Sequence, residues 1–126
     1  MGIMVKKHTE TRRFMEGAEE CREYYKTEKI TFGSSYLLPG QRGETDRGHR
    51  NSEEVFYVAK GVVLLEGDDS CYEMYGVDAA LVLPGTPHTL TNIGEEPALV
   101  TWSLAPGESS DLGSGDRSGN EICFGS

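Results

Sequence analysis

The sequence has little positive charge, no long apolar run and no leader-like start, and each shortage excludes a class of protein. Its 12 Lys and Arg stand against 21 Asp and Glu, for a formal net charge of −9, whereas non-specific binding to nucleic acid or anionic membrane requires clustered basic residues. No apolar run approaches the roughly 20 residues of a spanning helix, and residues 1–8 lack a signal-peptide core. We therefore expect a soluble, cytoplasmic protein that binds neither nucleic acid nor membrane.

Cysteine is also scarce. Cys21, Cys71 and Cys123 are an odd number, widely spaced, with no CxxC pair. This spacing is typical neither of a zinc ribbon nor of a redox pair. We expect reduced thiols that pack as small apolar side chains rather than act in catalysis.

The pattern of apolar residues divides the chain into three parts. Residues 1–27 are predicted to form an N-terminal arm, residues 28–105 a single domain, and residues 106–126 a flexible tail rich in Gly, Ser and Asp. Within the arm, four residues recur at spacings of three or four and predict a short amphipathic helix: Phe14, Ala18, Cys21 and Tyr25.

Short strand-like segments separated by turns fill residues 28–105. The first alternates, and one side of it carries Ile30, Phe32, Tyr36 and Leu38 before the turn at Pro39-Gly40. Further segments rich in β-branched, aromatic and aliphatic residues cover 55–59, 62–65, 71–75, 79–83, 89–91 and 98–104. Such even spacing, with glycine or proline in the turns, indicates an all-β antiparallel sandwich or barrel.

Two of the three histidines flank predicted strands, and one of them lies near a glutamate. His49 precedes Glu54 by five positions at one strand start, and His88 opens another strand. If both starts face one barrel mouth, two imidazoles and a carboxylate converge there, a set suited to Fe, Mn, Ni, Cu or Zn that leaves positions open for substrate. The competing interpretation is a solvated histidine, with Glu54 paired to Arg47 or Arg50.

Residues 43–61 and 83–92 resemble the two conserved motifs of the cupin superfamily. The residues in register with these motifs are Glu54, Gly61, Gly85, His88 and Asn92. The resemblance covers about residues 28–105. It implies a cupin double-stranded β-helix, a jelly-roll-like antiparallel barrel, with the site inside the barrel behind a short N-terminal arm.

The chain departs from the family at the His-x-His pair of the first motif, where His49 stands alone. Counted back from Glu54, His49 takes the second place, and Arg47 occupies the first. Counted forward from the motif glycine, it takes the first place, and Asn51 occupies the second. Either way, one imidazole of the family's usual three is missing.

The resemblance implies one divalent transition metal held by His49, Glu54 and His88, with Asn51 or Asp46 adding an oxygen. It implies an enzyme acting on a small oxygenated or anionic metabolite by dioxygenase, isomerase, decarboxylase or lyase chemistry. The fold alone does not choose among these reactions. The alternative is a metal-free cupin that binds or senses a small molecule, which the missing histidine favours.

Four further residues are candidates for contact with the substrate. Arg47 and Arg50 suit recognition of a carboxylate or phosphate, or they simply offset the acidic surface. Tyr36 and Tyr57 are predicted to orient the substrate or to donate a proton. Strand alternation counts against Tyr57, because it faces away from Glu54.

The resemblance also implies a homodimer. The strand of residues 28–38 would otherwise be an exposed sheet edge, which proteins tend to cover. We expect the N-terminal segment to be exchanged between two copies or packed against the partner's sheet.

Overall fold

A computed structural model describes residues 2–107 of the 126-residue chain. Its strands are β1 (Arg12–Glu16), β2 (Glu19–Lys26), β3 (Thr31–Leu37), β4 (Glu53–Lys60), β5 (Val63–Glu66), β6 (Cys71–Met74), β7 (Ala79–Val82), β8 (Thr89–Asn92) and β9 (Ala98–Ala105), preceded by the 3₁₀ turn η1 (His8–Glu10). Every strand predicted within residues 28–105 is present. The prediction of an all-β antiparallel fold is confirmed.

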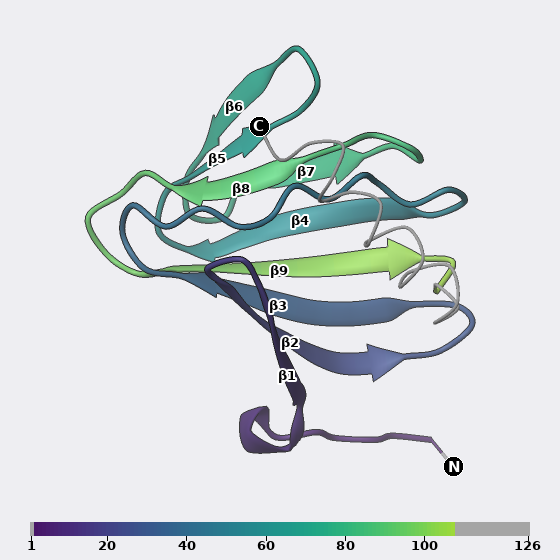
Figure 1. Cartoon of the computed structure of the whole chain (residues 1–126). Helices are drawn as coiled ribbons and strands as arrows, with labels where there is room; N and C mark the ends of the chain where they lie inside the picture. Colours follow the sequence, from purple (N-terminus) through teal and green to yellow (C-terminus); the bar gives the residue numbers. More distant parts are fainter. Residues whose placement is uncertain (1, 108–126) are drawn as a thin grey trace.

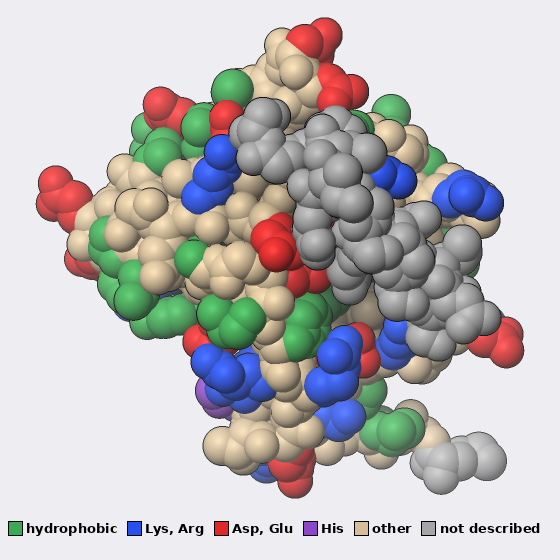
Figure 2. Space-filling view, viewed as in Figure 1, with side chains coloured by type: hydrophobic (Ala, Val, Ile, Leu, Met, Phe, Trp, Pro, Cys, Tyr) green, Lys and Arg blue, Asp and Glu red, His purple; other side chains and the backbone are tan. Residues whose placement is uncertain are grey.

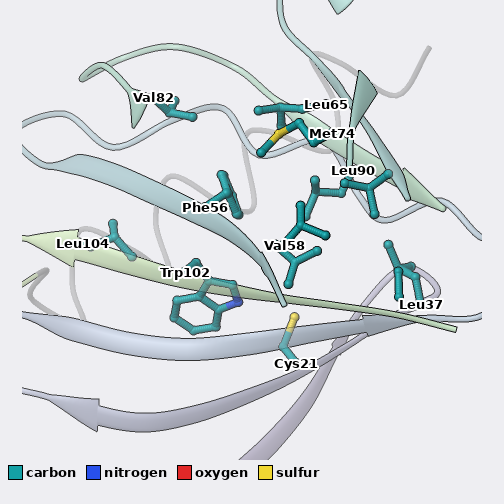
Figure 3. Close-up of a cluster of buried hydrophobic side chains, with 13 residues drawn as sticks. Cys21, Leu37, Phe56, Val58, Leu65, Met74, Val82, Leu90, Trp102 and Leu104 are labelled. Atoms are coloured by element: carbon teal, nitrogen blue, oxygen red, sulfur yellow. The ribbon is translucent and has the colours of Figure 1, made fainter. Parts of the chain in front are cut away.

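The strands form two sheets that enclose one core. The six-stranded sheet has the order β1-β2-β3-β9-β4-β7 and the three-stranded sheet the order β6-β5-β8, and neighbours in both are antiparallel (Figure 1). In β4 and β9 alternate residues are buried, as half-buried strands require. Their inward side chains meet those of β5, β6 and β8 between the sheets (Figure 3): Phe56, Val58, Leu65, Met74 and Leu90 among them.

The predicted N-terminal helix is wrong, because the residues concerned form the hairpin β1–β2, which turns at Gly17 with a φ of 64°. The spacing of four resulted from joining apolar residues across this turn. In β2 the burial alternates at its start, with Glu19 and Cys21 facing the interior and Glu20 less buried between them. Residues 12–26 therefore belong to the barrel rather than to a separate arm.

The other side of this hairpin carries ion pairs. Arg13 and Arg22 both pair with Glu20, at 2.6 and 3.3 Å, and Arg12 pairs with Glu23 at 3.1 Å. Figure 2 shows basic and acidic side chains together in this lower part of the molecule. Strand β2 thus places charged side chains on its outer side and Glu19 and Cys21 on its inner side, as expected for a strand with one face in the core.

The first predicted strand is present as β3, but the predicted facing is wrong. Tyr36 and Leu38 are exposed, whereas Gly33, Ser35 and Leu37 are buried. The inward side is small because the Trp102 indole packs against it: a Cβ added at Gly33 would lie 2.3 Å from that ring. Only small residues fit against the Trp102 indole. This buried side therefore lacks the large apolar residues that usually mark an inward-facing strand.

Strand β3 is also not the exposed edge that we predicted. It lies between β2 and β9, paired with β9 from Thr31 to Leu37 and with β2 from Thr31 to Tyr36. The chain's own N-terminal hairpin covers it, so edge protection by a partner is not required at this strand.

Among the described residues, no helix is long and apolar enough to cross a membrane. Cys21 is a buried free thiol and Cys71 an exposed one. Cys123 and all but the first two residues of the predicted tail, 106–126, lie outside the described part of the chain.

Candidate metal centre

The loop between β3 and β4 is held against the start of β8 by backbone contacts. Asp46 and His88 exchange two hydrogen bonds, each of 2.8 Å, and the Gly85 N–H donates to the His49 carbonyl oxygen at 2.8 Å. Gly48 has a φ of 106°, and a Cβ there would lie 2.7 Å from the Thr86 nitrogen. The loop therefore approaches the turn before β8 closely, and this approach brings the two motifs into one site.

Four side-chain atoms converge where these segments meet. Glu54 Oε1 lies 3.4 Å from His49 Nε2 and 3.2 Å from His88 Nε2. Asp46 Oδ2 lies 3.6 Å from His49 Nε2 and 3.8 Å from His88 Nε2. Ligands about 2.0–2.2 Å from a metal are roughly 3–3.6 Å from one another. The ligand atoms of Asp46, Glu54 and His88 all lie within 4.8 Å of one another, so these three side chains could hold one cation, and His49 Nε2 lies beside Glu54 and Asp46.

The bonding state of Glu54 independently indicates that these side chains suit a divalent transition metal. Glu54 Oε1 is buried and has no hydrogen-bond partner, although two imidazole nitrogens lie close to it. A buried acceptor left without a partner is rare, and a cation bound between Glu54, His49 and His88 would satisfy it. His88 Nδ1 donates to the Thr86 carbonyl oxygen at 2.9 Å, which leaves Nε2 available as a metal ligand.

The charges of the site also favour a bound cation. Burial would raise the pKa of Glu54, but the neighbouring imidazoles of His49 and His88 lower it to about 2. Burial would lower the pKa of His88, but Glu54 and Asp46 raise it to about 9. The two carboxylates thus stabilise the protonated, positively charged form of His88. A metal cation bound at the site could supply this positive charge in place of the proton.

Of the predicted ligands, the structure brings together His49, Glu54 and His88. Asn51 is exposed and does not line the cavity around them, so it is not a ligand in this arrangement. The Asp46 carboxylate, by contrast, lies beside the candidate ligands and could offer the additional oxygen. The reason is the backbone bridge between Asp46 and His88, which fixes this carboxylate over the site.

The four predicted substrate contacts lie away from this cavity. Tyr36 and Tyr57 are about two-fifths exposed, and each lies on the outer side of its strand. Arg50 is exposed and Arg47 half-buried, and neither lines the cavity. The placement of these four side chains does not support the predicted roles.

Two of the motif residues are structural. Asn92 is buried, and its amide donates to the Leu37 and Glu96 carbonyl oxygens at 2.9 and 2.8 Å while accepting from the Gly94 N–H at 2.8 Å. Gly61 has a φ of 97°, and a Cβ there would lie 2.8 Å from the Ala98 backbone. Both hold turns beside the barrel rather than serve the metal.

Sequence reasoning missed the other wall of the cavity. The cavity, of about 50 Å³, is also lined by Phe14, Glu16, Glu19, Glu44, Phe56, Thr89, Leu90, Trp102 and Leu104. Because part of residues 12–26 was predicted to form a helix outside the barrel, the acidic residues of the hairpin β1–β2 were not considered for this site. The alternation of Glu19 and Cys21 with charged neighbours was the available signal.

Glu19 is the most deeply buried of these acids. The Ser35 hydroxyl donates to its Oε2, the Cys21 thiol donates to the same oxygen at 3.7 Å, and Trp102 Nε1 donates to Ser35 Oγ at 3.0 Å. Burial and the charge of Glu16 raise the pKa of Glu19 to about 8, against the lowering effect of the Ser35 and Cys21 hydrogen bonds. Glu19 is therefore protonated at neutral pH.

This burial predicts a pH-dependent stability that Glu19→Gln removes. Below pH 4.5 both the folded and unfolded chains hold this proton. Between pH 4.5 and about 8 only the folded chain holds it, so the free energy of unfolding falls by about 1 kcal/mol per pH unit and then levels off. Urea denaturation from pH 4 to 9 should show this excess decline in the wild type relative to Glu19→Gln; parallel profiles would contradict it.

Comparison with known proteins agrees with this architecture. The family model described as a cupin domain matches residues 34–104. An uncharacterized protein of Methanocaldococcus jannaschii is 37% identical over 58 residues, and the match spans 46% of each chain, less than half the length of that relative.

Solved structures extend the likeness over most of the chain. KdgF from Halomonas sp. superposes with a TM-score of 0.74 at 18% identity, covering 89% of this chain and 99% of that one. A sugar phosphate isomerase of the cupin superfamily from Silicibacter pomeroyi gives 0.70 at 15% identity, covering 81% and 75%. At such identities the likeness establishes a common fold.

Proposed function

The chain belongs to the cupin family, and we propose that it is a metal-dependent enzyme acting on a small oxygenated metabolite. The observation that carries the proposal is the unpartnered, buried Oε1 of Glu54 facing two imidazole nitrogens. Asp46, His49, Glu54 and His88 would hold one divalent metal. When bound, that metal supplies Lewis-acid or redox chemistry to a substrate oxygen.

The lining of the cavity narrows the substrate class. Beside the metal ligands, its ionisable lining residues are the acids Glu16, Glu19 and Glu44, and no Lys or Arg is among the described residues that line it. An anion would be repelled wherever the metal does not compensate. We therefore favour a small hydroxy- or carbonyl-bearing molecule with at most one negative charge over a phosphate or dicarboxylate.

Apolar side chains close the remaining walls. The Phe56 ring packs edge-on against the His88 ring, with centroids 5.4 Å apart, and Leu90, Trp102 and Leu104 line the same space. These residues orient the imidazole and exclude water around a bound substrate, which strengthens electrostatic interactions in the site. Metal-free binding through Arg47, Arg50, Tyr36 and Tyr57 lacks comparable support, because those side chains lie elsewhere.

Metal analysis of purified protein tests the proposal. After incubation with zinc, manganese, iron, nickel or copper and desalting, at least one metal should remain at about one equivalent per chain. A content below about a tenth of an equivalent for all five metals would exclude the metal-dependent enzyme and favour the binding module.

We also propose a homodimer, formed through the outer side of the six-stranded sheet and the N-terminal residues. That side exposes Tyr36 on β3, Val55 and Tyr57 on β4, and Leu81 on β7, with β9 between β3 and β4. Ile3, Met4 and Val5 are 74–89% exposed. Apolar surface of this extent on a single chain usually marks an interface. A second copy of the chain would cover both.

Tyr57→Asp combined with Leu81→Asp should therefore dissociate the dimer. Light scattering coupled to size-exclusion chromatography is expected to give twice the chain mass for the wild type and the mass of one chain for the double variant, because two charges would be buried without partners. The matched control is Tyr72→Asp, at an exposed position of β6 in the other sheet, which should remain dimeric. A monomeric wild type would refute the interface.

A further inference from the structure

We propose that Glu19 is the acid–base residue of this centre, exchanging a proton with a carbon or oxygen of a small hydroxy-carbonyl substrate held at the metal. The inference rests on the proposed function and adds a reaction class, proton transfer, to it. Its basis is the position of Glu19 within the cavity, the contacts that fix its carboxyl group, and the charges around it.

Glu19 lies in the same cavity as the metal ligands but on a different wall. It comes from β2, whereas Glu54 comes from β4 and His88 immediately precedes β8, and all three line the one space. Figure 3 shows Cys21 and Trp102, the neighbours of Glu19, projecting from the large sheet into the interior. A substrate bound between these walls would contact both the metal and the Glu19 carboxyl group.

The carboxyl group of Glu19 is held by contacts to both of its oxygens. Trp102 donates to Ser35 at 3.0 Å and Ser35 donates to Glu19 Oε2, so the serine hydroxyl is fixed from both directions. Glu19 Oε1 lies against Gly43, where an added Cβ would come within 2.1 Å of it. The Gly43 N–H donates to the Leu90 carbonyl oxygen at 2.9 Å, so this loop is itself anchored to β8.

The surroundings keep Glu19 close to its titration point at neutral pH. Glu16 on β1, Glu44 in the loop and Glu54 on β4 line the cavity with it, and the Cys21 thiol is its neighbour on β2. Burial and the negative charges of Glu16 and Glu54 favour the protonated form, with a pKa of about 8. An acid–base catalyst is most effective when its pKa lies near the working pH.

The transfer balances without an added oxidant or reductant. In its ionised form, Glu19 takes the proton from a carbon next to the substrate carbonyl, and the electron pair of the broken C–H bond moves onto the carbonyl oxygen. Glu19 then returns the proton to the former carbonyl carbon, while the carbon that lost the proton becomes the new carbonyl as its hydroxyl proton passes to the first oxygen. The net reaction is an isomerisation between a hydroxy-aldehyde and a hydroxy-ketone.

The first test follows the titration of Glu19 through tryptophan fluorescence. Trp102 is the only tryptophan in the sequence, and Ser35 connects its indole to Glu19. Metal-free wild type should show an emission transition with a midpoint near pH 8, which Glu19→Gln abolishes. The matched control Glu20→Gln, an acid outside the cavity lining, should retain it. A transition unchanged in Glu19→Gln would overturn the proposal.

The second test measures the proton transfer itself. Zinc-loaded protein is incubated with dihydroxyacetone or glycolaldehyde in D₂O, and loss of the carbon-bound proton signal is followed by NMR. Glu19→Gln should lower the exchange rate at least about 100-fold, with zinc affinity within about twofold of the wild type; Glu20→Gln should match the wild type. Glutamine is isosteric and still accepts the Ser35 hydrogen bond, so folding is retained.

The outcomes separate the two proposals. A wild type that binds no zinc refutes the metal centre. A wild type that binds zinc but exchanges neither probe, or exchanges them equally fast as Glu19→Gln, refutes the role of Glu19 and leaves the metal centre intact.

Discussion

Replacing Glu54 with Gln is expected to weaken zinc binding by at least about 100-fold. The substitution keeps the shape of the side chain but removes the charge of the oxygen that lies 3.2 and 3.4 Å from the two imidazole nitrogens. Loss even of groups that only orient a ligand typically costs 10–100-fold in metal affinity, so loss of a charged ligand should exceed that. Competition against a chromophoric zinc chelator at pH 7.5 measures the effect; His88→Ala should behave in the same way.

Two controls make this result specific. Glu53→Gln carries the same chemical change on the exposed side of β4 and should leave the affinity within about twofold of the wild type. Asp46→Asn against Asn51→Ala identifies the additional ligand, because the structure places Asp46 at the site and Asn51 at the surface. Wild-type affinity in Glu54→Gln, or a loss confined to Asn51→Ala, would contradict the proposed ligand set.

Gly33→Ala is expected to destabilise the protein by about 3 kcal/mol, at the upper end for overpacking. The new methyl carbon would lie 2.3 Å from the Trp102 ring and 2.4 Å from the backbone oxygen of Arg22 on the neighbouring strand. Rotation of the indole would relieve only one of these contacts, because the β2 backbone is held by its pairing with β3. Thermal unfolding followed by circular dichroism should show a fall in Tm of roughly 10–20 °C.

The matched control is Gly76→Ala, in the turn between β6 and β7, where an added Cβ meets nothing within 4 Å. That variant should unfold within about 2 °C of the wild type, because neither space nor a positive φ opposes the methyl group. Equal Tm values for Gly33→Ala and the wild type would mean that the contact between β3 and Trp102 is looser than described.

The strands of residues 28–105 were predictable because their signal is local. Alternation in Val55–Lys60 or Ala98–Leu104 is a property of consecutive residues, and glycine or proline marks each turn. The same reasoning failed for residues 12–26, since spacings of three or four can arise from two strands on either side of a turn. It also inverted the facing of β3, where Trp102 from another strand had selected Gly33 and Ser35.

The candidate ligands His49, Glu54 and His88 could be chosen from the sequence, because few histidines exist and two lie at strand starts near the recognisable motifs. The additional oxygen could not be chosen between Asp46 and Asn51. The choice depends on a backbone bridge between residues 42 positions apart, Asp46 and His88, and no local pattern encodes a long-range pairing.

Residue types and their spacing were thus sufficient for the all-β class, the strand positions and three of the four proposed metal ligands, since each of these is written in neighbouring residues. Tertiary contact alone brought Glu19 into the cavity, joined it to Ser35 and Trp102, and left Glu54 Oε1 without a hydrogen-bond partner. The physical reason is that burial and proximity, which determine charge state and reactivity, arise between strands far apart in the chain.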